Sequence, residues 1–512
     1  MKKYFLAFTA IISINCVNAQ EIPDAIRLAQ ENLNGTARFR AMGGAFGALG
    51  GDLSAINVNP AGSVVFANNQ AGGTLTSFNT KNNANYFGSK TSQSENTFDL
   101  SQGGAVFIFE DRSGKSDWNK FSFALNYENT NNYDNSLFSK GTNPNNSVAN
   151  YFLSYANPTA TQGGFFLSNI KDYYYEELNY ADQQAYIGIL TNVIKPNVLD
   201  ENNDTYSTNN AGGNYYQENS IVATGFNGKL TFNGAASYKD KIFFGLSLNS
   251  HFTDYIQSTR FVERNNNNGV NSSSFDNDLY TYGSGFSFNL GVIGKINKEI
   301  RAGLSYESPT WYKLNDELKQ NLNTTGTNFI NYSNPTYNVY TINSGISNAN
   351  SDSNITMIYD PYKLRTPSKF TGSLAYIFGK KGLISVDYSI KDYSNTKFRD
   401  PYGDFANVNN RMNDILDTTG EIRIGAEYRI KQFSLRAGHR SEESPYKNSW
   451  TIGSLKSYSG GLGYNFGDTK LDLSYTYAKR ISNPSFFEQG FIDAARINSV
   501  NNNVSLTLLF EL

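Results

Sequence analysis

The feature that most constrains this chain is a two-residue alternation of apolar and polar side chains, which recurs from about residue 70 to the end. The ranges 382–394, 420–430 and 469–481 show it most clearly. Successive side chains of a β-strand point to opposite faces, so each range predicts a strand with one apolar and one polar face. Two folds use such strands: a sandwich with a dry core, and a membrane barrel with lipid outside and a wet lumen.

The lengths of the connections favour the barrel. We predict about 14 strands, near 71–88, 96–109, 119–133, 221–238, 242–258, 279–296, 299–310, 367–379, 382–394, 420–430, 432–442, 452–466, 469–481 and 498–511. Very short links, such as 239–241, 380–381 and 467–468, alternate with long ones rich in Asn and Ser. This sorting is typical of outer-membrane barrels. The sequence therefore predicts an all-β, transmembrane antiparallel barrel over 69–512, with both chain ends on the periplasmic side.

The composition agrees with a barrel. Charged residues make up 17% of the chain, below the roughly 25% of soluble domains. The mean hydropathy is −0.48, and no apolar run of about 18 residues follows residue 19, so no membrane-spanning helix is predicted. The net charge of −2 gives no broad basic surface, and we expect no nucleic-acid partner.

Residues 1–19 have the pattern of a cleaved signal peptide. Lys2 and Lys3 precede an apolar stretch, and Val17-Asn18-Ala19 offers a small-residue cleavage site. The only cysteine, Cys16, lies in this stretch, so we expect the mature chain to contain no thiol. The segment predicts export, here to the outer membrane.

The segment before the barrel is rich in glycine. Six glycines fall between positions 43 and 62, and the side chains between them are short. Glycine reaches backbone conformations that other residues avoid, so such a segment can fold tightly. We predict a hatch over 20–68 that plugs the lumen, beginning with a short amphipathic helix near 22–33.

The order of these features resembles the FadL-like family of outer-membrane transporters for long-chain fatty acids and other hydrophobic compounds. The local match runs from Gly35 to Ala61 and ends in Asn59-Pro60-Ala61. Three features depart from the family pattern: the additional segment 20–34, the long Asn-rich loops, and the final Leu512 in place of an aromatic residue.

The resemblance implies a transporter without enzymatic activity. A small hydrophobic ligand would be caught among the outer loops, enter an apolar pocket in the lumen, and leave sideways through the wall at a strand kink after the hatch moves. Outer-membrane lipids are the other expected partner, and we expect a monomer. The sequence leaves open a non-transporting surface barrel, such as an adhesin, and an open polar porin.

Two sets of residues are candidates for the site. The ligand and hatch candidates are Arg38, Arg40, Gly43, Gly44, Asp52, Asn59, Pro60 and Ala61. The expected lumenal charges are Asp387, Arg423, Glu427, Arg429, Arg436 and Asp472. We expect the two hatch arginines to anchor the hatch to lumenal carboxylates, with contact to a carboxylate ligand as the alternative. Asp52 is either a latch or a helix cap.

No catalytic, cofactor or metal site is predicted. The chain has two histidines, His251 and His439, which lie far apart without ligand-spaced neighbours. The longest insertion, 134–220, contains many Tyr and Ile side chains and a predicted helix near 181–194. It is either a surface that captures the ligand or a cap packed on itself.

Overall fold

The structure is a computed structural model that describes residues 21–512 except 112, 114, 161, 211, 333–340, 344, 352–354 and 400–404. It is an antiparallel barrel of 14 strands. The strands are β1 (Gln70–Tyr86), β2 (Ser89–Glu110), β3 (Trp118–Asn132), β7 (Tyr215–Tyr238), β8 (Ile242–Arg264), β9 (Val270–Lys295), β10 (Ile300–Glu307), β17 (Lys369–Phe378), β18 (Gly382–Asp392), β20 (Thr418–Ile430), β21 (Phe433–Glu442), β22 (Ile452–Asn465), β23 (Thr469–Ser482) and β24 (Arg496–Glu511). Each pairs with the next, and β24 pairs with β1 to close the ring.

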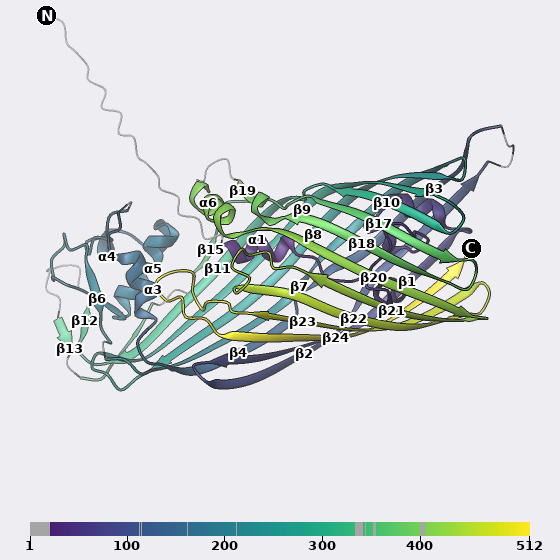
Figure 1. Cartoon of the computed structure of the whole chain (residues 1–512). Coiled ribbons are helices and arrows are strands. Elements are labelled where there is room, and N and C mark those ends of the chain that lie inside the picture. Colours follow the sequence, from purple (N-terminus) through teal and green to yellow (C-terminus); the bar gives the residue numbers. More distant parts are fainter. Residues whose placement is uncertain are drawn as a thin grey trace, which may run out of the picture.

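Further short strands extend the wall or the loops. They are β4 (Asn135–Asn143), β5 (Ile194–Pro196), β6 (Tyr206–Thr208), β11 (Trp311–Gly326), β12 (Phe329–Asn331), β13 (Thr341–Asn343), β14 (Ser347–Asn350), β15 (Thr356–Ile358), β16 (Tyr362–Arg365) and β19 (Lys397–Arg399). Of these, β4 pairs with β7, and β11 continues β10 along β9. The wall therefore rises unevenly and is tallest along β7, β8 and β9 (Figure 1).

The faces of the strands follow the predicted alternation. Ile422 and Ile424 are each 38% exposed, whereas Arg423 between them is 8% exposed. Likewise, Leu473 is exposed and its neighbour Asp472 is buried. Apolar side chains thus cover the outer face of the ring, where they would meet lipid, and polar side chains line the lumen.

The two ends of the barrel differ in their connections. Short turns at 239–241, 296–299, 379–381, 431–432 and 466–468 gather at one end, here called the turn end. The opposite end, the loop end, carries the long connections (Figure 1). Two of its links are shorter than predicted, because β1 and β2 form a hairpin through Phe87-Gly88 and β9 begins at Val270. The strand ends at these two links are rich in Asn and Ser and polar on both faces, so the sequence shows no apolar–polar alternation there.

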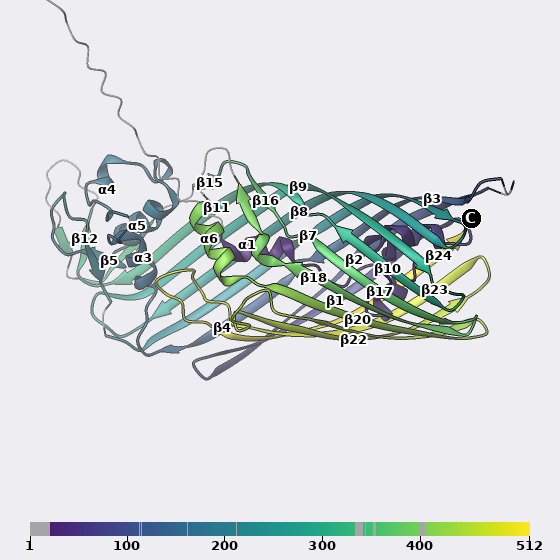
Figure 2. The same ribbon diagram turned by 45° about the horizontal axis from the view of Figure 1, so that its top comes forward.

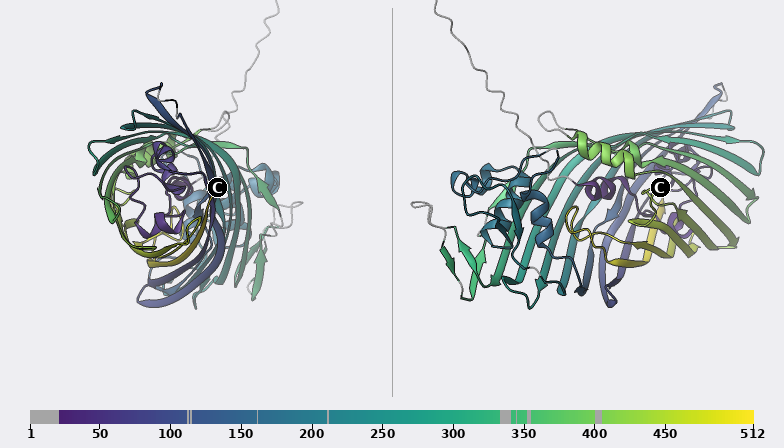
Figure 3. Two further views of the ribbon diagram at one scale, coloured as in Figure 1. Left: turned by 90° about the vertical axis from the view of Figure 1, so that its right-hand side faces the viewer. Right: turned by 60° about the vertical axis from the view of Figure 1, so that its left-hand side comes forward.

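Residues 21–66 lie inside the ring of strands (Figure 3). They form α1 (Ile22–Ala29), α2 (Ala37–Ala41) and the 3-10 turns η1 (Ser54–Asn57) and η2 (Pro60–Val65). Helix α1 lies toward the loop end, and the chain then descends to β1 at the turn end (Figure 1). The prediction that both chain ends lie at the turn end is therefore wrong for the first described residues, although the C-terminus does lie there.

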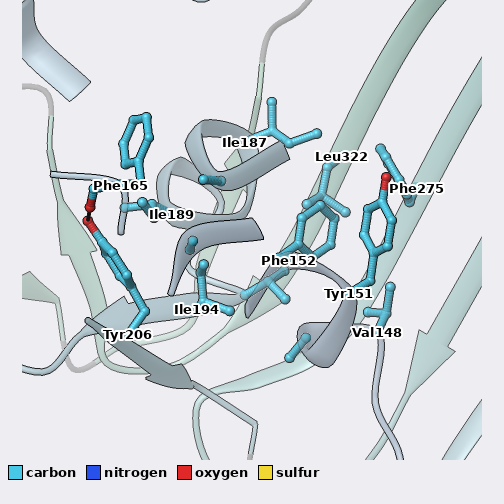
Figure 4. Packing of buried hydrophobic residues seen from close by; sticks show 14 of the residues in the cluster. Val148, Tyr151, Phe152, Phe165, Ile187, Ile189, Ile194, Tyr206, Phe275 and Leu322 are labelled. Atoms are coloured by element: carbon cyan, nitrogen blue, oxygen red, sulfur yellow. Dashed lines mark hydrogen bonds between the residues drawn. The ribbon is translucent and has the colours of Figure 1, made fainter. Parts of the chain in front are cut away.

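A folded cap covers part of the loop end. It contains α3 (Ala149–Ala156), α4 (Asn169–Asp172), η3 (Tyr175–Glu177) and α5 (Tyr180–Leu190). Phe152, Ile187 and Ile189 are fully buried there and belong to one hydrophobic cluster with Phe275 and Leu322 of the strands (Figure 4). The cap is thus packed on itself, the second of the two alternatives for this insertion. It spans about 144–214 because β4 was not predicted and β7 begins earlier than predicted.

Two smaller elements lie beside the barrel mouth: α6 (Ala406–Ile415) and the turn η4 (Tyr393–Asn395). Helix α6 lies close to the visible end of α1 (Figure 2). Among the described residues, no helix has the length and apolarity needed to cross a membrane.

Candidate functional site

The glycine-rich segment turns sharply where it meets the wall. Gly43 and Gly44 have φ angles of 62° and 75°, in the left-handed region that glycine adopts at least cost. A Cβ atom on Gly43 would lie 2.9 Å from the carbonyl oxygen of His439 on β21. These two glycines therefore end α2 and allow the backbone to lie directly against the wall.

The two hatch arginines have different surroundings. Arg38 Nε donates to Glu427 of β20 at 2.9 Å, and its Nη1 donates to the Gly51 carbonyl oxygen at 2.9 Å. Arg40 is fully buried, and burial lowers its pKa to about 10. Its Nη1 donates to Asn34, while Nε and Nη2 have no hydrogen-bond partner among the described residues. Arg38 thus pairs with a carboxylate, whereas Arg40 has no ion pair among the described residues.

Replacing each arginine by methionine should change the free energy of unfolding in opposite directions. Arg38→Met leaves Glu427 buried with one cation fewer, so we expect a loss of about 3–5 kcal/mol in the free energy of unfolding. Arg40→Met keeps the volume and removes an unsatisfied charge, so we expect a gain of about 1–3 kcal/mol. Urea unfolding of the detergent-solubilised barrel measures both. Equal losses for the two variants would contradict this assignment.

Asp52 connects α2 to the turn η1. Its carboxylate accepts hydrogen bonds from Thr36 Oγ1 at 2.8 Å and from the Ser54 backbone N–H at 2.9 Å. Burial raises the pKa of this carboxyl. The bond to Ser54 is that of a cap at the start of η1, and the bond to Thr36 ties α2 to that turn.

Asn59, Pro60 and Ala61 contact the lumenal side of β7, β8, β9 and β10. Asn59 Nδ2 lies 2.7 Å from the Gly47 carbonyl oxygen, 3.1 Å from that of Val292 and 3.4 Å from that of Leu304. Its Oδ1 accepts from the Ala61 N–H at 3.1 Å. One side chain thus fixes its own turn, a second loop of the plug, and two neighbouring strands.

Glycines in the wall make this close approach possible. A Cβ on Gly291 would clash with Asn59 Oδ1, and one on Gly245 would clash with the backbone of Pro60. A Cβ on Gly303 of β10 would clash with the carbonyl of Gly47. The wall between the plug and the outside is therefore only one backbone thick at these positions.

Further contacts join the plug to the neighbouring strands β18 to β23. Asp387 accepts a hydrogen bond from the Gly47 N–H at 3.0 Å. Glu427 accepts from Arg38, Arg429 and Arg436, and Arg436 also binds Asp472 at 2.5 Å. Arg423 pairs with Glu421 at 2.7 Å. Arg423, Arg429 and Arg436 thus each have a carboxylate partner on the lumenal face of the strands.

An apolar groove of about 1030 Å³ lies on the outer face of the same strands. Leu246, Leu290, Leu304 and Phe370 form its sides, and Gly291 lies in its lining. The groove therefore faces the membrane at the point where Asn59 and Pro60 touch the wall from within.

The wall is interrupted by proline on the loop side of this groove. Pro309 separates β10 from β11, and Pro367 separates β16 from β17. Because proline has no N–H, it cannot donate to the ladder, and strands break or bend at such positions. Thr310 and Thr366 bridge the gap through a hydrogen bond from the Thr366 N–H to the Thr310 carbonyl at 3.0 Å.

The lumen between the plug and the loop end differs from expectation. We predicted an apolar pocket, whereas the pocket there, of about 340 Å³, is bordered mainly by Asn, Ser and Thr side chains such as Asn82, Asn501 and Ser457. The apolar space in this part of the described lumen is filled by α1. The sequence predicts the amphipathic helix but does not single out Glu31, which follows it and binds Lys369 at 2.7 Å. No local pattern could indicate this ion pair, because Lys369 is far away in sequence.

Comparisons with known proteins agree with this geometry. A family model described as outer membrane protein transport protein (OMPP1/FadL/TodX) matches residues 201–492, more than half of the chain. A crystal structure of a Pseudomonas aeruginosa FadL homologue superposes with a TM-score of 0.55 at 12% identity, covering 94% of this chain and 99% of that chain. The crystal structure of the P. putida toluene transporter TodX gives a TM-score of 0.50 at 12% identity, with the same coverage. No curated protein matches the sequence significantly. At this identity the two structures show a shared fold.

Proposed function

Because this chain belongs to the OMPP1/FadL/TodX family of outer membrane transport proteins, we propose that it conducts hydrophobic compounds across the outer membrane without chemical change. Long-chain fatty acids are the expected class. The loop end faces outward, residues 20–68 act as the hatch, and the signal peptide over 1–19 is removed on export.

One observation carries this proposal: Asn59 and Pro60 touch the inner side of a wall whose outer side is an apolar groove. Burial of a long acyl chain is favourable by about 0.8 kcal/mol per CH₂, so such a ligand would move from the lumen into the groove without entering water. The exit lies between β9, β10 and β17, below the interruptions at Pro309 and Pro367.

In this scheme the plug works as a switch. Asn59 holds β9 and β10 from within, and movement of residues 47 and 59–61 would free the thin part of the wall. Arg38 remains attached to Glu427 of β20, three strands along the ring from β10. The plug can therefore shift at the exit while staying anchored, which suits repeated opening.

Replacing Pro60 by alanine tests the exit. Without the fixed proline conformation, the contact of residues 59–61 with the wall should be weaker by up to about 1 kcal/mol. The ratio of plugs released from the wall to plugs seated on it would then rise by a factor of about five. We expect uptake of a fluorescent fatty acid into liposomes to rise by up to about fivefold, with the unfolding temperature of the barrel almost unchanged. Pro158→Ala, in the exposed part of the cap, is the matched control. Parallel losses of uptake and heat stability would assign Pro60 a purely structural role.

A non-transporting surface barrel is the second candidate, because the cap has a packed core of its own. The same liposomes distinguish the two functions. A surface protein gives no uptake of any hydrophobic compound, with or without Pro60→Ala. An open porin passes sugars with the hatch in place.

A further inference from the structure

The apolar groove on the lipid-facing side of the wall is lined at its floor by small residues. Gly234 and Ala236 of β7 and Gly372 of β17 belong to its lining. A Cβ atom on Gly234 would meet nothing within 4 Å, and one on Gly372 would meet only Leu304 Cδ2, at 3.9 Å. Glycine in the interior of a strand often marks a place where a ligand approaches the backbone. The groove volume of about 1030 Å³ equals that of the largest usual ligand pockets, roughly 1,000 Å³.

A belt of aromatic side chains lies between this groove and the turn end. The ring centroids of Trp118 and Tyr238 are 5.2 Å apart, and Trp118 also packs against Phe244, a lining residue of the groove, at 6.0 Å. Tyr376 and Phe378 continue the belt on β17. In membrane barrels such belts lie at the level of the lipid head groups. The groove therefore lies just inside the head-group level at the turn end.

The turns directly beyond the belt carry an excess of positive charge. Residues 239–241, 295–299 and 379–381 contain six lysines and only two acids, Asp240 and Glu299. The lysines are Lys239, Lys241, Lys295, Lys298, Lys380 and Lys381. The other links at the turn end, 111–117, 431–432 and 466–468, contain three bases and three acids. The excess is thus confined to the strands that carry the groove.

Four of these lysines are free to bind an anion. Lys239 pairs with Asp117 at 3.3 Å. Lys295 pairs with Asp240 at 2.8 Å. Among the described residues, no carboxylate forms an ion pair with the remaining four, here called the turn lysines: Lys241, Lys298, Lys380 and Lys381, all of them exposed.

The turn lysines are close to the groove. Phe244 lies three residues from Lys241, which is about 10 Å at the spacing of a β-strand. The Lys295 N–H donates to the Lys241 carbonyl oxygen at 2.8 Å, so the turn that contains Lys298 lies beside Lys241. Near a membrane surface, each lysine favours an anionic head group by a factor of about five. An apolar groove beneath unpaired lysines therefore matches a lipid with long chains and a negative head group.

We propose that the groove and the turn lysines form a binding site for a phospholipid with an anionic head group, taken from the periplasmic leaflet; this inference rests on the proposed orientation of the barrel, with its loop end outward. The acyl chains lie along Gly234 and Gly372, and the phosphate lies at the turn lysines. Because Asn59 and Pro60 touch the inner side of the same wall, the bound phospholipid covers the proposed exit from the membrane side.

Quenching of tryptophan fluorescence by brominated lipids measures the lipid preference at this place. The three tryptophans are Trp118, Trp311 and Trp450. Trp118 packs beside the groove, and Trp311 stacks on Phe286 further toward the loop end; both are exposed. Variants that keep one tryptophan, with phenylalanine at the other two positions, are reconstituted in mixtures of phosphatidylcholine and brominated phosphatidylglycerol. We expect phosphatidylglycerol to be preferred at least about fivefold at Trp118 and no more than about twofold at Trp311.

Replacing the four turn lysines by glutamine tests the head-group contact. The preference for phosphatidylglycerol at Trp118 should then fall to within about twofold. The matched control replaces four lysines that lie away from the groove and form no ion pair with a described residue: Lys90, Lys140, Lys195 and Lys431. It removes the same charge from the chain and should keep the full preference.

Filling the groove tests the contact with the acyl chains. Gly234→Leu should weaken the binding of phosphatidylglycerol at Trp118 by at least about fivefold. Gly103→Leu on β2, where a Cβ atom also meets nothing within 4 Å, is the matched control and should leave the binding unchanged.

Three results would overturn the phospholipid site. They are equal quenching by the two lipids at Trp118, a preference of the same size at Trp311, and a preference that survives the loss of the turn lysines. Self-association of the barrel that Gly234→Leu abolishes, without any lipid preference, would make a second copy of the chain the occupant instead. These results leave the transport proposal intact. Absence of fatty-acid uptake together with an intact lipid preference would overturn the transport proposal alone.

Discussion

Replacing Gly291 by valine is expected to unseat residues 59–61 and make the barrel leak. The valine Cβ would clash with Asn59 Oδ1, and the Pro60 ring lies next to the same position. Forcing extra atoms into a well-packed contact costs about 1–3 kcal/mol, which changes the ratio of displaced to seated plug by a factor of roughly 5–150. Liposome swelling in sugars measures the leak, and we expect it to rise by at least fivefold.

Gly294→Val is the matched control for this change. Gly294 lies on the same strand, and a Cβ there would meet no atom within 4 Å. Valine suits strands, so this variant should fold normally and exclude sugars as the parent protein does. Equal swelling with the two variants would show that residues 59–61 do not seal the lumen.

The second large effect is expected at Glu427, the carboxylate shared by three arginines. Glu427→Gln keeps the shape of the side chain but leaves Arg38 and Arg429 without their carboxylate partner, while Arg436 retains Asp472. Removing one partner from a buried ionic cluster costs about 3–5 kcal/mol. We expect a lower unfolding midpoint in urea and easier proteolysis of the plug segment.

Two further variants sharpen this prediction. Glu110→Gln affects a half-exposed carboxylate whose ion pair with Lys120 spans 3.5 Å, and such surface pairs contribute at most about 1 kcal/mol. Combining Glu427→Gln with Arg38→Met removes both partners, so the double variant should lose less than the sum of the single losses. Additive losses would show that Arg38 and Glu427 do not act as a pair.

The outward and inward faces of the strands could be predicted from sequence because the alternation is a local property. The same alternation assigns Glu427 and Asp472 to the polar face, and both side chains are buried. The hairpin at Phe87-Gly88 and the extension of β3 into β4 were missed. Their Asn- and Ser-rich strands are polar on both faces, so periodicity gives no signal there, and pairing with neighbours decides their conformation.

The partners of the hatch arginines were less predictable than the inward or outward faces of the strands. Arg38 and Arg40 are two residues apart and look equivalent in sequence, yet Arg38 binds Glu427 and Arg40 forms no ion pair with any described residue. The short helix α2 turns them toward different sides of the lumen. The wall residues that they meet are distant in sequence, and no local pattern specifies that meeting.

A lipid-facing barrel and a compact N-terminal segment could be predicted without coordinates, because hydrophobic periodicity, link lengths and glycine content act through neighbouring residues. Only the tertiary structure decided what the lumen contains. It placed α1 among the apolar side chains of β11, β16, β19 and α6, paired Glu31 with Lys369, and seated Asn59 against glycines of the barrel wall. The physical reason is that closing the ring brings strands from the whole chain around one segment, and the resulting contacts depend on three-dimensional fit and charge balance.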